Sequence, residues 1–159
     1  MGDFMSAEYV IRLEDPRQED VMRMLSALDR YLQSLYPPES NHILDIATLC
    51  APNVRFFVAR RGVDPVGCGA PRVEAGYGEA KRMFVVPEAR GQNVGRAILR
   101  CIEDQAAREG LALMRLETGI HQAAAHALYR SGGYAECAPF GEYRLDPLSV
   151  FMEKRLLTR

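Results

Sequence analysis

The segment Lys81–Leu99, KRMFVVPEARGQNVGRAIL, constrains the fold of this chain more than any other stretch. Residues 79–86 are rich in apolar and β-branched side chains and predict a strand, which must end at Pro87. The apolar spacing of residues 94–108 predicts a helix that begins almost at once, and residues 113–117 predict the next strand. A strand–helix–strand unit of this kind is a right-handed crossover, so its two strands are expected to be parallel.

The turn within this segment contains Arg90, Gly91 and Gly95. The first N–H groups of a helix have no intrahelical partners, and the helix dipole gives them partial positive charge. The turn is therefore predicted to bind a phosphate or pyrophosphate, with Arg90 and Arg96 adding full charges. The alternative is a strand-to-helix turn that needs small residues only for its backbone path. The segment matches neither GxxxxGK[ST] nor GxGxxG, which excludes a Walker P-loop and a Rossmann fingerprint.

The rest of the chain predicts a mixed sheet covered by helices, which is an α/β (mixed α+β) fold. Further strands are predicted at residues 9–13, 54–60, 66–74 and 149–154, and further helices from Asp15-Pro16 to Leu35, near 43–49 and at 122–131. The strands at 54–60, 66–74 and 79–86 are joined by tight turns and predict an antiparallel meander. Pro71 is a defect in it, because proline cannot donate to a strand ladder.

Length and composition narrow the class of protein. The 159 residues, 48% of them hydrophobic and 26% charged, predict one globular domain spanning 1–159. A net charge of −1 argues against a strongly basic nucleic-acid binder. The four cysteines are irregularly spaced without a CxxC pair, and His121 and His126 lack partners at ligand spacing, so we expect no metal site. Met1–Glu8 does not read as a signal peptide and no apolar run approaches ~20 residues, so we expect a cytoplasmic protein without membrane contact.

The strand end and turn resemble motif A of the GNAT (GCN5-related) N-acetyltransferase superfamily, whose pattern is [Q/R]xxGx[G/A] after a strand ending V-x-P. Val85-Val86-Pro87 matches the strand end, and Arg90-Gly91-Gln92-Asn93-Val94-Gly95 matches the turn. Asn93 stands where the family usually has glycine. Asparagine is the non-glycine residue best able to take a left-handed backbone, so the turn is expected to keep its shape.

A second stretch, LETGIHQAAAHALYRSGGY at 116–134, resembles motif B of the same family. Its helix carries the N-x-x-A-x-x-L-Y pattern, with Gln122 at the Asn position, Ala125 at the Ala position and Leu128-Tyr129 at the Leu-Tyr position. Gly133-Tyr134 replaces the usual Gly-Phe. The two motifs stand in the family order, and the opening strand and helix and the final strand also fit the family layout, so the resemblance covers nearly the whole chain.

The resemblance implies a GNAT fold with splayed parallel strands and a cleft that binds acetyl-CoA as cosubstrate. It implies that the turn amides hold the pyrophosphate, that the pantetheine arm runs beside Phe84 and Val85, and that Gln122 hydrogen-bonds this arm. The Val85 amide would polarise the thioester carbonyl. The implied cofactor-binding residues are Phe84, Val85, Arg90, Gly91, Gln92, Asn93, Val94, Gly95, Arg96 and Gln122.

The implied activity is acetyl transfer to a primary amine of a small molecule or peptide, by direct attack in a ternary complex. Tyr129 would act as the general acid that protonates the thiolate, because a phenol and a thiol have similar pKa values. Glu79 would act as the base through water, and Glu117 on the neighbouring strand is a weaker candidate. Many relatives lack a dedicated base. As an alternative, Tyr129 packs an aromatic ring against the sheet and Glu79 is a surface group.

The acceptor is predicted to bind between the first helix, the loop after it and the segment after Tyr134. The residues expected there are Tyr31, Tyr36, Glu39, His42, Tyr143 and Asp146. Two other functions stay open at this point: a non-catalytic acyl-CoA sensor, and an acyltransferase with another acyl-CoA or an oxygen acceptor. Since many relatives dimerise, the resemblance also leaves a homodimer open.

Overall fold

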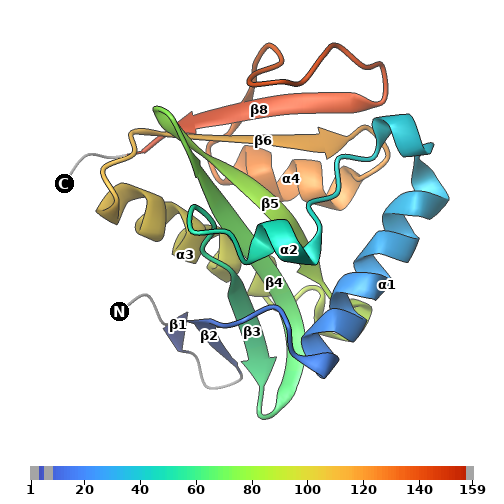
Figure 1. Cartoon of the computed structure of the whole chain (residues 1–159), viewed down its shortest axis with the longest axis vertical. Helices are drawn as coiled ribbons and strands as arrows, with labels where there is room; N and C mark the ends of the chain where they lie inside the picture. Colours follow the sequence, from blue (N-terminus) through green and yellow to red (C-terminus); the bar gives the residue numbers. More distant parts are fainter. Residues whose placement is uncertain (1–3, 6–8, 157–159) are drawn as a thin grey trace.

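One mixed β-sheet forms the centre of the molecule, in a computed structural model that describes residues 4–5 and 9–156 (Figure 1). Its strands lie in the order β1-β2-β3-β4-β5-β6-β8-β7. The strands are β1 Phe4–Met5, β2 Val10–Leu13, β3 Phe57–Arg61, β4 Asp64–Glu74, β5 Tyr77–Val85, β6 Leu113–Gly119, β7 Ala135–Glu136 and β8 Ser149–Arg155. The helices are α1 Glu19–Leu35, α2 Ile46–Leu49, α3 Val94–Arg108 and α4 Ala123–Ser131.

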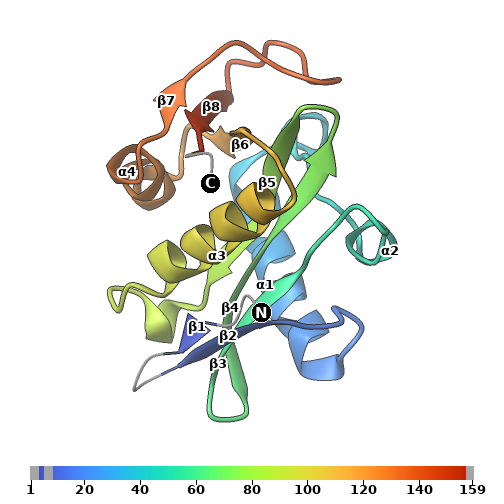
Figure 2. The ribbon, with the colours of Figure 1, turned by 90° about the vertical axis from the view of Figure 1, so that its left-hand side faces the viewer.

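The helices cover both faces of the sheet, with α1 and α2 on one side and α3 and α4 on the other (Figure 2). Each face has its own apolar core, because successive side chains of a strand point to opposite faces. In β3, Phe57 and Ala59 join the core under α3, whereas Val58 joins the core under α1. On α1, the predicted apolar face is buried at Val21, Leu25 and Leu28.

Most sequence predictions of elements are confirmed. The helix predicted at 94–108 is α3, with the same bounds, and the predicted antiparallel meander is β3-β4-β5. The crossover strands β5 and β6 are parallel, as predicted. The first helix begins at Glu19 rather than at Asp15-Pro16, and β3 begins at Phe57 because Val54 forms only an isolated bridge with Arg72.

Two short strands were not predicted. β1 and β7 have two residues each, which is too short for an alternating pattern to be visible in the sequence. Apart from β1, the segment 1–8 on which the signal-peptide prediction rests lies outside the described residues. Across the part of the chain that is described, no helix is long and apolar enough to cross a membrane.

The parallel strands β5 and β6 diverge, and this opens the sheet at the carboxyl end of β5. They pair at Gly78↔Met114 and Glu79↔Arg115 and then separate. A bulge in the β4–β5 ladder follows, where Arg82 takes a left-handed backbone with φ of 58°. The Arg82 side chain is 4% exposed and pairs with Asp29 of α1, so helix and bulge are held together. The splayed strands expected from the family resemblance are therefore present.

Candidate active site

The turn from β5 into α3 has the conformation of an anion-binding site. A 3₁₀ turn at Pro87–Ala89 leads to Gly91 and Asn93, whose backbones are left-handed with φ of 78° and 64°. Asn93 thus adopts the conformation that the sequence predicts for a residue in place of glycine. It is the N-cap of α3, and its side chain makes no capping hydrogen bond. The first amides of α3 are not capped by that side chain, so they can serve a ligand.

A cavity of about 380 Å³, here called the turn cavity, extends from this turn along β5 to α4. Every predicted cofactor residue lines it except Gln92, whose side chain accepts a hydrogen bond from Arg61. Sequence reasoning missed Leu28 and the start of α4, which also line it, and placed Tyr31 in the acceptor site. The Ala-rich pattern at 123–125 is the signal that could have identified the start of α4 as part of the cavity wall, because small side chains leave room for a ligand.

The backbone of Val85 is directed into the turn cavity. The neighbouring Val86 N–H donates to the Val66 carbonyl of β4, at 2.9 Å. Successive N–H groups of a strand point to opposite edges, so the Val85 N–H faces away from β4, toward the gap left by β6. The Val85 carbonyl accepts a hydrogen bond from Arg90 Nε at 3.1 Å. An amide donor is therefore available at the edge of the cleft.

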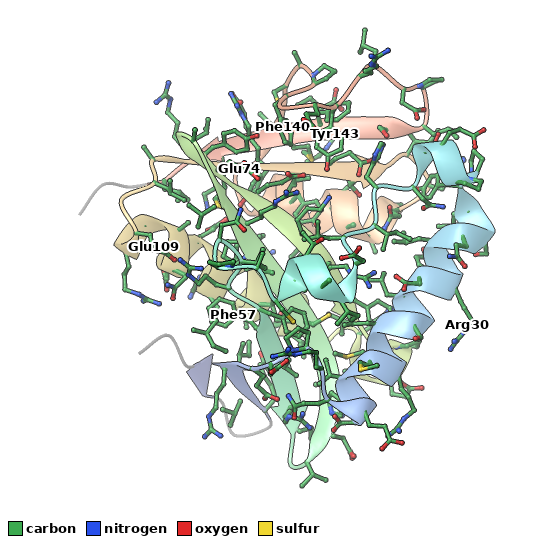
Figure 3. The ribbon with its side chains drawn as sticks, viewed as in Figure 1. Arg30, Phe57, Glu74, Glu109, Phe140 and Tyr143 are labelled. Carbon is green, nitrogen blue, oxygen red and sulfur yellow. The ribbon has the colours of Figure 1, made fainter. Side chains whose placement is uncertain are left out.

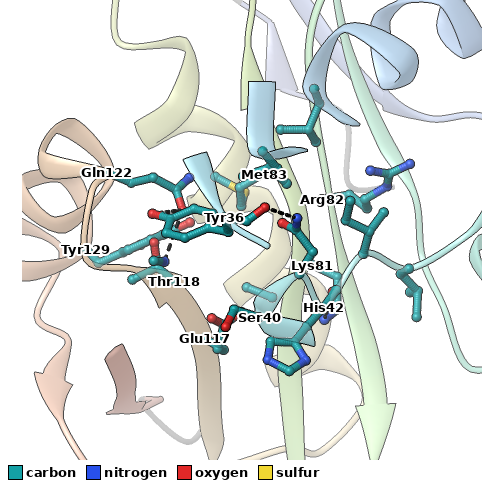
Figure 4. Close-up of a pocket in the computed structure, with 17 residues that line it drawn as sticks. Tyr36, Ser40, His42, Lys81, Arg82, Met83, Glu117, Thr118, Gln122 and Tyr129 are labelled. Atoms are coloured by element: carbon teal, nitrogen blue, oxygen red, sulfur yellow. Dashed lines mark hydrogen bonds between the residues drawn. The ribbon is translucent and has the colours of Figure 1, made fainter. Parts of the chain in front are cut away.

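A second cavity of about 90 Å³, the inner cavity, lies between α1, β5 and β6 (Figure 4). Tyr36, His42, Lys81 and Glu117 line it on the side away from the turn. The residues common to the inner cavity and the turn cavity are Leu28, Met83, Gln122 and Tyr129. The two cavities therefore meet at these side chains.

Tyr129 stands where the two cavities meet. It is 6% exposed, and no other described residue forms a hydrogen bond with its hydroxyl. Burial raises the pKa of Tyr129, and the charge of Glu117 raises it further. The phenol is therefore protonated at neutral pH, and the raised pKa also makes it a weaker acid than the free phenol whose pKa lies close to that of a thiol.

Glu117 of β6 is the acidic residue of the inner cavity. Its Oε2 accepts a hydrogen bond from Ser149 Oγ at 2.8 Å. Burial raises the pKa of the Glu117 carboxyl; the hydrogen bond from Ser149 and the charges of His42 and Lys81 act against the rise. A carboxylate with a raised pKa is a stronger base than an ordinary glutamate.

Glu79 lies elsewhere. It is 5% exposed, and its Oε2 accepts a hydrogen bond of 2.5 Å from the Tyr143 hydroxyl and lies 3.6 Å from Lys81 Nζ. It lines a third cavity of about 660 Å³, the outer cavity, which also holds the predicted acceptor residues Glu39, His42, Tyr143 and Asp146. Glu79 and Tyr129 are thus not brought together in one cavity.

Lys81 forms the wall between the inner and outer cavities. Its Nζ donates to the His42 carbonyl at 3.0 Å and to the Tyr143 hydroxyl at 2.9 Å. Sequence reasoning did not assign it to the site, although its i, i+2 spacing from Glu79 places both on one face of β5. Tyr143 is held over β8 by Phe140, at 5.1 Å between ring centroids (Figure 3).

A hydrogen bond of 2.6 Å from Ser40 Oγ to Asp146 Oδ2 joins the loop after α1 to the loop before β8. This contact lowers the pKa of Asp146.

Within the described residues, no group of three or more potential metal ligands is present. The arrangement suits transfer of a group between an anionic ligand in the turn cavity and a ligand in the inner cavity, with Tyr129 between them.

Comparison with known proteins agrees with this geometry. The family model described as an acetyltransferase (GNAT) domain matches residues 52–136. An "IAA acetyltransferase" of Azospirillum brasilense is 55% identical over 148 residues, which cover 92% of this chain and 97% of that protein. The uncharacterized N-acetyltransferase YsnE of Bacillus subtilis is 32% identical over 149 residues, covering 92% of this chain and 99% of that protein.

Solved structures share the fold. A crystal structure of a candidate acyl-CoA N-acyltransferase from Klebsiella pneumoniae is 36% identical, with a TM-score of 0.80, and the match covers 96% of this chain and 100% of that one. The PaiA N-acetyltransferase of Thermoplasma acidophilum, solved in complex with coenzyme A, has a TM-score of 0.70 at 17% identity, covering 95% of this chain and 99% of that one.

Proposed function

Since the chain belongs to the GNAT acetyltransferase family and is an acyltransferase, we propose that it transfers the acetyl group of acetyl-CoA to a primary amine of a small molecule or peptide. Both substrates are bound at once, and the amine attacks directly. The observation that carries this proposal is the meeting of the turn cavity and the inner cavity at the unpartnered Tyr129 hydroxyl. The likeness to the Thermoplasma acidophilum structure, which holds coenzyme A, supports the choice of carrier.

The residues of the turn cavity fit this carrier. The amides from Gly91 to Arg96 bind the pyrophosphate at the positive end of α3. Phe84 and Val85 lie beside the pantetheine arm, and Gln122 contacts the arm from the other wall. The Val85 N–H donates to the carbonyl oxygen as negative charge develops on it.

Acetyl-CoA, when bound, supplies a thioester whose C–S bond breaks as the C–N bond to the acceptor forms. Tyr129 donates its proton to the departing sulfur. The acceptor nitrogen loses one proton in the same exchange, and a base must take it. Tyr129 then recovers a proton from solvent through the open cavities.

We assign the base to Glu117 rather than to Glu79, which the sequence predicts. Glu117 lines the inner cavity together with Tyr129, whereas the Glu79 carboxylate is occupied by Tyr143 and Lys81. The charge of Glu79 raises the pKa of Glu117 further, so Glu79 contributes to the strength of the base from a distance.

Binding of acetyl-CoA is the first test. We expect millimolar acetyl-CoA to raise the melting temperature of the protein, because a ligand that binds the folded state alone stabilises it. An acceptor panel of amino acids, polyamines and peptides, assayed by thiol release, then tests transfer. A melting temperature that does not move with acetyl-CoA would overturn the proposal.

A further inference from the structure

Tyr36 connects the acceptor side of the molecule to the wall of the turn cavity. It is the C-cap of α1, is 6% exposed and lines the inner cavity. Its phenol reaches the connection between β6 and α4, where the hydroxyl accepts a hydrogen bond from the His121 N–H at 3.1 Å. The same hydroxyl donates to Gln122 Oε1, at 3.4 Å (Figure 4).

The place of the Tyr36 hydroxyl is tightly defined. A Cβ on Gly119 would lie 1.8 Å from it, so this position of β6 has room for the phenol only because it lacks a side chain. The Tyr36 ring also stacks on His121, with 5.7 Å between ring centroids. Burial raises the pKa of Tyr36, so the hydroxyl keeps the proton that it donates.

The contacts of Gln122 determine which end of its amide faces the cavities. Its Oε1 accepts from the Gly119 N–H at 3.0 Å as well as from Tyr36. Two donors on one oxygen identify that atom as the carbonyl oxygen, so Nε2 carries two protons. Nε2 has no hydrogen-bond partner among the described residues, and Gln122 lines both the turn cavity and the inner cavity.

We propose that Tyr36 is a positioning residue, which holds the Gln122 amide with its Nε2 protons available to the pantetheine arm. This inference rests on the proposed function, in which Gln122 contacts that arm. A pantetheine arm offers amide carbonyl oxygens, which accept hydrogen bonds and do not donate them. Without the Tyr36 hydroxyl, only the Gly119 N–H holds Oε1, so the Gln122 amide is fixed less firmly with its Nε2 protons toward the arm.

Calorimetric titration of acetyl-CoA against four proteins tests the assignment: wild type, Tyr36→Phe, Gln122→Ala and the double variant. We expect Tyr36→Phe to weaken acetyl-CoA binding about fivefold, as for loss of one hydrogen bond, and to have no further effect once Gln122 is alanine. Adenosine 3′,5′-bisphosphate has no pantetheine arm, so its affinity should be the same for wild type and Tyr36→Phe.

Two further variants complete the design. Tyr134 lines none of the three cavities, and its hydroxyl donates to Glu103 at 2.8 Å. Tyr134→Phe loses this buried hydroxyl and keeps the ring that packs against Tyr129, so it should bind acetyl-CoA as wild type does. Gln122→Glu keeps an acceptor for Tyr36 and Gly119 but loses the Nε2 protons, so it should weaken acetyl-CoA binding at least as much as Gln122→Ala. This variant tests the role of the protons without altering Tyr36.

The outcomes separate the two proposals. Wild-type protein that does not bind acetyl-CoA overturns the proposed function and this inference with it. Wild-type binding with equal affinity in Tyr36→Phe overturns this inference alone. Tyr36→Phe could also lose as much acetyl-CoA affinity when Gln122 is already alanine, or lose affinity for the bisphosphate. Either result assigns Tyr36 a general structural role and overturns this inference.

Discussion

The Tyr129 side chain combines deep burial with a hydroxyl that no other described residue engages. Buried hydroxyls are normally hydrogen-bonded, so one that faces two cavities is available to a ligand. We expect Tyr129→Phe to lower kcat about 10²-fold, with little change in the acetyl-CoA Kd. Steady-state assays of thiol release with a true acceptor measure kcat, and calorimetry measures the acetyl-CoA Kd. Unchanged turnover would return Tyr129 to a packing role.

Glu117 and Glu79 offer a matched pair of isosteric variants. We expect Glu117→Gln to lower kcat about 10²-fold and Glu79→Gln to lower it by less than about tenfold, because in the proposed mechanism Glu117 takes the proton and Glu79 only raises the pKa of Glu117. High pH should partly restore the rate of Glu117→Gln, since hydroxide and neutral amine become more abundant. The reverse order of the two losses would support Glu79 as the base.

The raised pKa of Glu117 also predicts a pH-dependent effect on stability. A carboxyl with a raised pKa in the folded state stabilises the protein below its unfolded pKa of 4.5, and this stability is lost as pH rises through the folded value. Glu117→Gln keeps a neutral group at every pH. We therefore expect its melting temperature, relative to wild type, to increase from pH 4 to pH 8. A difference that stays constant over this range would show that burial does not raise the pKa.

At the scale of elements, the connection from β5 to α3 depends on one unusual backbone conformation. Asn93 has φ of 64°, a conformation that costs a β-branched residue about 1–2 kcal/mol. We expect Asn93→Val to lower the free energy of unfolding by this amount and to weaken acetyl-CoA binding, whereas Asn93→Gly should keep both. Denaturant titration and calorimetry measure the two effects. Equal behaviour of the two variants would mean that the turn does not require the left-handed residue.

The elements themselves were largely predictable because their patterns are local. The period of apolar residues in α3 and the glycine and proline positions around it depend on neighbours in the chain, and its bounds were predicted without error. The first helix begins later than predicted, although Asp15-Pro16 is a good start signal. Asp15 instead forms a hydrogen-bonded ion pair with Arg17 ahead of the helix. No local sequence pattern predicts the bulge at Arg82, because arginine rarely takes a left-handed backbone.

At the scale of the whole molecule, two loops far apart in the chain meet over the outer cavity. Ser40 donates a hydrogen bond to Asp146, and the His42 ring contacts the Tyr143 ring at 5.0 Å between centroids. We expect Ser40→Ala to raise the KM for the acceptor about threefold, with acetyl-CoA affinity unchanged, because the bond holds the acceptor side alone. Kinetics with each substrate varied in turn separates the two constants. A parallel loss of acetyl-CoA affinity would contradict this division of the molecule into a carrier side and an acceptor side.

The turn between β5 and α3, the strand–helix–strand crossover and the likeness to an acetyltransferase could be derived from residues 79–134, since each depends on residues close together in the chain. The partners of Glu79 and the meeting of Tyr36 with Gln122 could not. Glu79 and Tyr143 are 64 positions apart in the chain, and Tyr36 and Gln122 are 86 positions apart. Such contacts form only when packing on both faces of the sheet brings loops and strand ends together, and no local pattern of side chains encodes that distance.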